Sequence, residues 1–398
     1  MKREFNGNAP TGTQPQVEAA FPETIHEEEE MFRKMALERY LQHMSYTQQN
    51  SENSSAVSHA NNTAPSASAR FQEVLKIGQG SFGDVFIVHD TVSGVYLTMK
   101  RMQLLHRPGE RYKGLYNATA RELFLLRCLK HENIVELVDY HIDASGALKM
   151  YMAVVAHDLG SLMRIWRHKG PRGEPSKGRM PLSTIKCLFH QLLSGLAYLH
   201  SKAIVHRDLK TSNVMIDEKG VLKIIDFGWS RYFPPKCPAK LTGPPCPISY
   251  RPPEVLITGK HKQSYDASID IWCAALILFE MLSGGKQLIN ASSEAEAASA
   301  IVSLLGSPSS TSKLYYGTPQ VDITFKKNLP RRLAHRCQLI HIDSDAVDIL
   351  ERMLQLEPAD RATAASLLDH RWFTTPPALC LPSEISLPST NTYRWAKS

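Results

Sequence analysis

The sequence lacks the features that mark secreted, membrane-spanning and zinc-bound proteins. Its 7 cysteines are scattered and form no Cys-x-x-Cys pair, so we expect neither a disulfide framework nor a zinc module, and a reducing compartment inside the cell suits them. The first residues contain no apolar signal segment, and the longest apolar run, residues 271–279, is too short to cross a bilayer. We therefore expect an intracellular protein that has no membrane partner and buries residues 271–279 in a core helix.

Strong charge of one sign is missing as well. The 398 residues carry a formal net charge of +7, and no recognisable nucleic-acid-binding motif accompanies this mild basicity. Such a balance permits acidic or phosphorylated partners but does not demand nucleic acid, so we expect no direct nucleic-acid partner. Apolar residues make up 43% of the chain, which is typical of a globular protein with a sizeable core.

The two ends of the chain differ in composition from its middle. Residues 1–69 are rich in Asn, Ser, Thr, Gln and Ala and poor in aromatics, which predicts a disordered extension because such a segment cannot offset its ordering entropy. Within it, residues 27–44 begin with four acids and continue with spaced apolar residues, which predicts a short amphipathic helix. A transient helix in a tail and a docking element both remain open for it. Residues 374–398 are rich in Pro and Ser, and this composition predicts an irregular tail.

Polar residues at the ends of short apolar runs gather in residues 204–228, which read IVHRDLKTSNVMIDEKGVLKIIDFG. Asp208 is followed five residues later by Asn213, and Asp226 opens an Asp-Phe-Gly triplet. The apolar runs predict short strands that hold these side chains on a rigid scaffold. An Asp base, an Asn and a second Asp in this order are the groups needed to handle a metal-bound phosphate. The weaker alternative is a polar hairpin with incidental acids.

Glycines recur between two predicted strands near residue 80. A lone Gly-x-Gly-x-x-Gly also occurs in dinucleotide-binding folds, but there the glycines open a helix, whereas here a strand follows them. Glycines between strands let the backbone lie close over phosphates, and Lys100 on the next predicted strand can reach the phosphate oxygens. The segment predicted to bind the nucleotide comprises Ile77, Gly78, Gln79, Gly80, Ser81, Phe82, Gly83, Asp84 and Val85.

Lys100 requires an acidic partner, because an unpaired lysine facing a cleft is costly. The helix predicted around residues 118–126 offers Glu122. Farther along, residues 148–163 predict a strand that runs into a helix. Residues 181–199 predict a strongly periodic helix that leads into residues 204–228.

Over residues 71–373 the chain resembles the eukaryotic protein kinases, through the glycine motif, HRDLKTSN, DFG and RPPE. The resemblance implies a two-lobed α+β fold, with a small antiparallel β-sheet lobe and one key helix at residues 71–155. A larger, mainly helical lobe would follow at residues 156–373, with ATP and Mg²⁺ between the lobes. The HRDLK form resembles the serine/threonine kinases rather than the tyrosine kinases.

The resemblance also implies a role for each motif residue. Asp208 would accept the proton of the substrate hydroxyl as catalytic base, and Lys210 would steady the transferring phosphoryl group. Asn213 and Asp226 would hold Mg²⁺, while Lys100 with Glu122 would grip the α- and β-phosphates. Ala153 and Val155 would present their backbone groups to adenine. Glu254 and Arg361 match a pair that anchors the activation segment.

Within the family the chain resembles the cyclin-dependent kinases, which belong to the CMGC group, through ATARE, HDLGSLM, YRPPE and LGSP. The segments IGQGSFGDVF and FTTPPALCLPSEI favour the transcription-associated branch. This resemblance implies a protein substrate, a cyclin-type subunit on the Glu122 helix, and a nuclear location, with the cytoplasm as the other compartment. Arg121, Arg207 and Arg231 match three arginines that converge on a phosphothreonine in this group, and Thr242 occupies that position here.

Some positions depart from the family pattern. Thr98 stands where an alanine usually lies beneath adenine, and Pro247 and Ser249 replace the Thr and Trp of the substrate groove. The usual Thr contacts the catalytic Asp208 through its hydroxyl, and proline has no side-chain donor. We therefore carry two hypotheses: an active cyclin-dependent serine/threonine kinase, which we favour, and a catalytically weak kinase-fold scaffold that binds protein partners.

Overall fold

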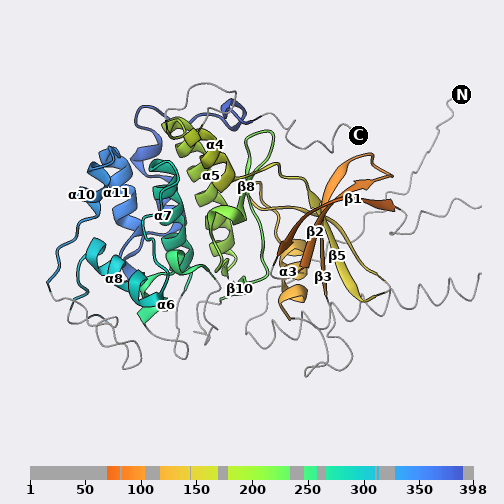
Figure 1. Cartoon of the computed structure of the whole chain (residues 1–398), viewed down its shortest axis with the longest axis horizontal. Helices are drawn as coiled ribbons and strands as arrows, with labels where there is room; N and C mark the ends of the chain where they lie inside the picture. Colours follow the sequence, from red (N-terminus) through yellow and green to blue (C-terminus); the bar gives the residue numbers. More distant parts are fainter. Residues whose placement is uncertain are drawn as a thin grey trace, which may run out of the picture.

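The computed structural model describes residues 70–80, 83–103, 117–143, 145–168, 178–233, 246–257, 266–309, 312 and 328–388. The predictions for residues 1–69, for Ser81 and Phe82, and for Thr242 fall outside these residues. Figure 1 shows a sheet-rich lobe beside a larger, mainly helical lobe, and the predicted fold class is confirmed. No helix in the described part of the chain is long and apolar enough to span a membrane.

The small lobe is built on one antiparallel sheet with strand order β1-β2-β3-β5-β4. Its strands are β1 Phe71–Gly80, β2 Gly83–Asp90, β3 Tyr96–Gln103, β4 Leu137–Ile142 and β5 Ala147–Ala153. Buried and less buried positions alternate along the start of β3, as expected for a strand with one face on a core. The helix α3 Asn117–Cys128 lies in this lobe and packs its buried Leu123 and Phe124 into the core shared with Met150 of β5.

The large lobe contains most of the helices. They are α4 Leu159–His168, α5 Leu182–Ser201, α6 Pro253–Ile257, α7 Ser268–Leu282, α8 Glu294–Leu305, α10 Leu333–Gln338, α11 Ser344–Met353 and α12 Ala364–Leu368. Leu188, Leu192 and Leu196 follow one another at intervals of four residues on α5, so they form one buried ridge of this helix. Helix α7 contains residues 271–279 and is buried almost throughout, which confirms the core helix expected from that run.

Short strands carry the motif region between the lobes, as the sequence predicts. They are β6 His157–Asp158, β7 Ile204–Val205, β8 Val214–Ile216, β9 Leu222–Ile224 and β10 Arg231–Tyr232. Strand β8 lies between β6 and β9, and β10 pairs with β7. Leu209 and Phe227 are buried in the main core, so these two side chains fix the loops after β7 and β9 to that core.

Single turns of 3₁₀ helix complete the described fold. They are η2 Thr211–Asn213, η3 Ile248–Tyr250, η4 Pro358–Asp360, η5 Arg371–Phe373 and η6 Pro382–Glu384. The segment after η5 follows the large lobe, where the Cys380 amide donates to the Ser183 carbonyl of α5 over 3.3 Å. The cysteines in the described residues are free thiols, in agreement with the absence of a disulfide framework.

Candidate active site

The loop after β7 is held in a strained conformation by a buried carboxylate. Arg207 has a backbone φ of 72°, in the left-handed region that costs a non-glycine residue about 1–3 kcal/mol. Asp270, at the start of α7, accepts hydrogen bonds from the backbone amides of His206 over 2.8 Å and of Arg207 over 3.0 Å. The His200 ring nitrogen Nε2 lies 3.0 Å from the same carboxylate. These contacts hold the turn that positions Asp208.

Asp270 is fully buried yet suited to remain ionised. Burial by itself would raise the pKa of this carboxyl, but the hydrogen bonds and charge of His200 and the Arg207 amide lower it overall. An ionised acceptor binds backbone donors more strongly than a neutral one. Asp270 was not among the predicted site residues. The one sequence signal for this role was an acid at the start of an apolar helix. Helix N-termini favour acids in general, so this signal does not distinguish a carboxylate that supports the loop.

The carboxylate of Asp208 is held on one oxygen. Its Oδ2 accepts from Lys210 Nζ over 2.8 Å and from Asn213 Nδ2 over 3.0 Å. Asn213 Nδ2 also donates to the Asp208 carbonyl over 2.7 Å. The second oxygen, Oδ1, is buried and has no hydrogen-bond partner within the described residues. A fixed carboxylate with one uncommitted oxygen is suited to accept a proton from a reacting hydroxyl.

His206 connects this loop to the Asp-Phe-Gly triplet. Its ring nitrogen Nε2 lies 3.0 Å from the Ile225 carbonyl, and its ring meets Phe227 edge to face at 5.2 Å. The Ile225 amide donates to the Asn213 carbonyl over 3.0 Å. Asp226 follows directly and has a φ of 67°. The structure therefore brings Asn213 and Asp226 onto adjacent chain segments, as the sequence predicts.

Lys100 meets both Glu122 and Asp226. Its Nζ lies 2.6 Å from Glu122 Oε1 and 3.0 Å from Asp226 Oδ1. Burial would lower the pKa of Lys100, but the two carboxylates raise it overall, so this side chain stays protonated. Burial likewise opposes charge on Asp226, and the ammonium of Lys100 outweighs it and lowers the pKa of Asp226. The predicted Lys100–Glu122 contact is therefore confirmed, and Asp226 is a third member that the sequence did not pair with it.

The glycine segment joins β1 to β2. Gly83 has a φ of 153°, and a Cβ at this position would lie 2.0 Å from the Arg101 carbonyl oxygen of β3, so only glycine fits here. Ile77 is 46% exposed, while Gly78 and Val85 are partners across the hairpin. The carboxylate of Asp84, a residue of the segment predicted to bind nucleotide, meets Lys76 at 2.7 Å and Arg101 at 3.3 Å. These two ion pairs join β2 to its neighbours β1 and β3, and the nucleotide contact of Asp84 stays a prediction.

Strand β5 leads from the sheet into the connection between the lobes. Ala153, its last residue, is exposed, and Val155 is half-buried two residues later. Thr98 of β3 is the cross-strand partner of Met152, so the hydroxyl-bearing residue lies next to this connection. The backbone groups at Ala153 and Val155 are thus at the end of the strand that neighbours the Lys100 strand, where the sequence predicts adenine contacts.

The three predicted phosphate-binding arginines lie on α3, on the loop after β7 and on β10. Arg121 precedes Glu122 on α3 and is buried, and Arg207 is buried in the loop after β7. Arg231 of β10 is the cross-strand partner of Val205, two residues before Arg207. Arg207 Nη1 donates to the Trp229 carbonyl over 3.0 Å. Since Thr242 lies outside the described residues, its contact with these arginines stays a prediction.

Two further pairs fix the segment that follows. Arg361 donates to both oxygens of Glu254 over 2.7 and 2.6 Å, which confirms the predicted ion pair. Tyr250 donates its hydroxyl to Glu280 of α7 over 2.5 Å. The pair of Tyr250 and Glu280 was not predicted, because a Tyr and a Glu so far apart in sequence carry no joint signal. The substituted residues Pro247 and Ser249 lie in the turn before Tyr250, with Pro247 exposed.

Comparison with known proteins gives a family for this arrangement. The family model for the protein kinase domain matches residues 71–373. The chain is 31% identical over 330 residues to a probable serine/threonine-protein kinase of Arabidopsis thaliana, covering 82% of this chain and 54% of that protein. It is 29% identical over 333 residues to cyclin-dependent kinase C-2 of Oryza sativa subsp. japonica, covering 79% of this chain and 61% of the relative. With mitogen-activated protein kinase hog1 of Aspergillus niger it shares 34% identity over 309 residues, covering 76% of this chain and 77% of the relative. The chain thus spans little more than half the length of the first two.

Proposed function

The chain belongs to the protein kinase family, as a divergent member of the CMGC group that includes cyclin-dependent and mitogen-activated kinases, and from this premise we propose its reaction. The proposed activity is transfer of the γ-phosphoryl group of ATP to serine or threonine hydroxyls of protein substrates. The serine/threonine type agrees with the HRDLK form of the loop and with the description of the Arabidopsis relative.

Two observations support this proposal most. Lys100 contacts two carboxylates, and Asp208 has one carboxylate oxygen that is hydrogen-bonded and one that is not within the described residues. Lys100 Nζ lies 2.6 Å from Glu122 and 3.0 Å from Asp226. In phosphoryl transfer the protein acts mainly by positioning the reactants and neutralising charge, because the transition state is loose. A fixed ammonium and a proton-accepting carboxylate oxygen are the groups that such catalysis requires.

The side chains fit Mg²⁺ and ATP. Mg²⁺ prefers oxygen ligands and is commonly bound by one or two carboxylates together with substrate phosphates. Asp226 is ionised and 28% exposed, so its carboxylate can take a cation, and Asn213 supplies an amide oxygen from the adjacent segment. When bound, Mg²⁺ and ATP supply the γ-phosphoryl group and part of its charge neutralisation. The backbone of Ala153 and Val155 would contact adenine.

The protein residues then have separable roles. Asp208 Oδ1 would orient the substrate hydroxyl and accept its proton, while Oδ2 stays bound to Lys210 and Asn213. Lys210, which is 26% exposed, keeps its ammonium beside the position where the phosphoryl group passes. Lys100 would hold the α- and β-phosphates in place of its contact with Asp226, with Glu122 fixing its position.

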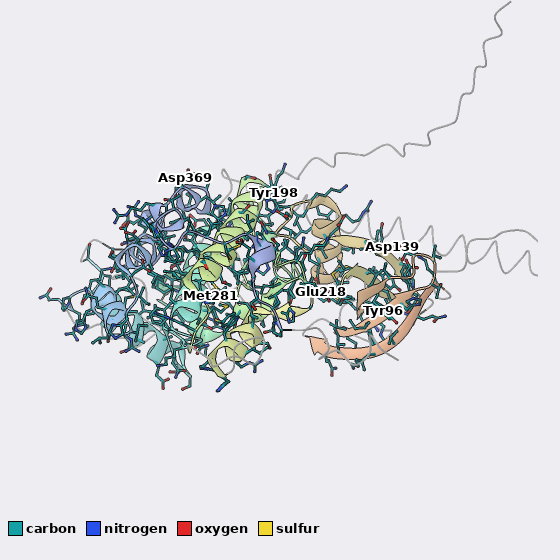
Figure 2. All side chains as sticks on the ribbon, turned by 90° about the horizontal axis from the view of Figure 1, so that it is seen from above. Tyr96, Asp139, Tyr198, Glu218, Met281 and Asp369 are labelled. Carbon is teal, nitrogen blue, oxygen red and sulfur yellow. The ribbon has the colours of Figure 1, made fainter. Side chains whose placement is uncertain are left out.

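A radiolabelled-phosphate transfer assay tests this reaction. We expect Asp208→Asn to reduce transfer by about 10²–10⁴-fold, the range for loss of a general base. Asp369→Asn is the matched control, since Asp369 is exposed and lies at an edge of the large lobe (Figure 2). Transfer by the unchanged chain equal to that of Asp208→Asn would refute the enzyme and favour the kinase-fold scaffold.

We further propose that activity depends on a cyclin-type subunit and on phosphorylation of Thr242. A subunit pressing on α3 would act directly on the Lys100–Glu122 contact, since Glu122 lies on that helix. A phosphate on Thr242 carries close to two negative charges and would attract Arg121, Arg207 and Arg231. Pull-down of the intact protein from nuclear and cytoplasmic fractions, with identification of any cyclin, tests the partner and the proposed nuclear, transcription-linked role together.

A further inference from the structure

A cavity of about 180 Å³ lies on the small lobe between the end of α3 and β4. We call it the α3–β4 cavity. Its lining includes Leu126, Arg127, Lys130, Val138, Asp139 and Tyr140. Pockets for nucleotides and other small ligands usually enclose about 300–1,000 Å³, so this cavity is too small for them. Its volume suits the apolar side chains of a docked polypeptide segment.

The lining of the cavity combines apolar side chains with two bases, Arg127 and Lys130, and two acids, Glu136 and Asp139. Val138 is 49% exposed, and the side chains of Arg127 and Lys130 are exposed beside it. The guanidinium of Arg127 lies 5.5 Å from the centre of the Tyr140 ring. Asp139 is paired with Arg70, so the bases Arg127 and Lys130 face Glu136 as the other acid of the lining. This balance fits an amphipathic segment that carries acids next to its apolar anchors.

Arg70, the first residue that the structure describes, lies at the edge of this cavity. Arg70 donates to Asp139, which lines the cavity, over 2.9 Å and to Asp90 over 2.8 Å. Its guanidinium also lies 4.5 Å from the centre of the Phe71 ring. Asp139 faces the surface of the small lobe (Figure 2). The chain that precedes residue 70 therefore joins the fold beside the α3–β4 cavity.

Residues 27–44 have the complementary chemistry. Four acids occupy residues 27–30, and Leu37, Leu41 and Met44 follow at helical spacings of four and three. Residues 45–69, which connect this segment to Arg70, are rich in Ser and Asn, and a chain of that length and composition spans about 25–30 Å. Tethering at that range gives the segment an effective concentration on the order of millimolar, so the site would be occupied even if its affinity for the segment is weak.

We propose that residues 27–44 dock within their own chain into the α3–β4 cavity, with an apolar side chain in the cavity and residues 27–30 facing Arg127 and Lys130. Docking would brace the end of α3, the helix that holds Glu122 against Lys100. The binding step is independent of the proposed kinase activity, and only its effect on transfer rests on that activity.

Hydrogen–deuterium exchange on the full-length chain tests the docking. Strand β4 is at the edge of its sheet, so the amides of residues 136–140 depend on whatever covers them. We expect the double substitution Leu37→Asp and Leu41→Asp to speed the exchange of these amides about tenfold. A tethered segment at an effective concentration of about 1 mM would occupy a site with a Kd of roughly 0.1 mM about ten times as often as it leaves it empty, and the substitutions remove this protection. Val57→Asp, an apolar residue of the connecting segment, is the matched control and should leave exchange unchanged.

A charge exchange adds a second measurement. Lys130→Glu should also speed exchange at residues 136–140, and combining it with lysines at residues 27–30 should restore the slow rate. Unchanged exchange in the Leu37→Asp, Leu41→Asp chain would overturn the proposal. Slow exchange that is lost on dilution would also overturn it, because the occupant would then be a second copy. The readout needs no phosphate transfer, so loss of activity with docking intact would refute the kinase proposal alone.

Discussion

Replacement of Asp270 by Asn is the sharpest test of how the active-site loop is held. The two oxygens of this buried carboxylate accept from the amides of His206 and Arg207 and meet the ring of His200. An amide keeps one acceptor oxygen and turns an NH₂ group toward the remaining donors. About two hydrogen bonds to a charged acceptor are then lost, each contributing about 1.5–3 kcal/mol.

We therefore expect Asp270→Asn to lower the free energy of unfolding by about 3 kcal/mol, which corresponds to two bonds at about 1.5 kcal/mol each. The left-handed turn at Arg207 would relax, and Asp208 would shift with it. Turnover should fall at least tenfold, while the KM for ATP stays nearly constant because the contacts of Lys100 are untouched. Urea unfolding followed by tryptophan fluorescence and steady-state kinetics measure the two effects.

The pH dependence of this substitution has a defined sign. The folded-state pKa of Asp270 lies below its ordinary value of 3.8. The stability that the carboxylate contributes is therefore present above pH 3.8 and is lost as the pH falls through the folded pKa. The stability difference between the unchanged chain and Asp270→Asn should narrow under acid conditions.

Asp266→Asn is the matched control for Asp270→Asn. Asp266 precedes the same helix and is exposed, and its carboxylate accepts from the Ser268 amide over 2.9 Å. We expect its unfolding free energy and turnover to stay close to those of the unchanged chain. Equal unfolding midpoints for Asp270→Asn and Asp266→Asn would refute the idea that the carboxylate supports the loop.

Three further outcomes are expected. Glu122→Gln should raise the KM for ATP and lower kcat/KM about tenfold or more, because the charged partner of Lys100 is lost; equal kcat/KM with the exposed-site control Glu132→Gln would contradict this. Gly83→Ala should destabilise the chain by at least ~1 kcal/mol in urea, since its Cβ would lie 2.0 Å from the Arg101 oxygen, whereas Gly78→Ala meets nothing within 4 Å; equal midpoints would show that the hairpin adapts. Thr242→Ala should abolish most activity of the purified complex with its cyclin-type subunit, and unchanged transfer would remove Thr242 from the regulatory proposal.

Local pattern predicted most of the elements at the site. Alternating apolar residues gave the antiparallel strands, and the short apolar runs around residues 204–228 gave β7, β8 and β9. Element ends were less well predicted. The helix expected over residues 181–199 begins one residue later, after Pro181, and continues to Ser201.

By itself, the sequence predicted the groups of the proposed reaction, because these residues lie at fixed, short spacings. Asp208, Lys210, Asn213 and Asp226 lie within one segment of alternating strands and turns, so local geometry is enough to gather them. The family resemblance added Lys100 and Glu122 as partners, and the structure brings these two side chains into contact.

Only the tertiary structure decided which contacts support that chemistry. The hydrogen bonds from His206 and Arg207 to Asp270, the bond from Tyr250 to Glu280, and the engagement of Asp84 by Lys76 and Arg101 depend on packing between elements. The same holds for the ion pair that joins Arg70 to the rim of the α3–β4 cavity. Hydrophobic periodicity specifies which face of an element is buried but not which distant polar group it meets. Those partners are fixed only when buried donors and acceptors must be satisfied in the packed core.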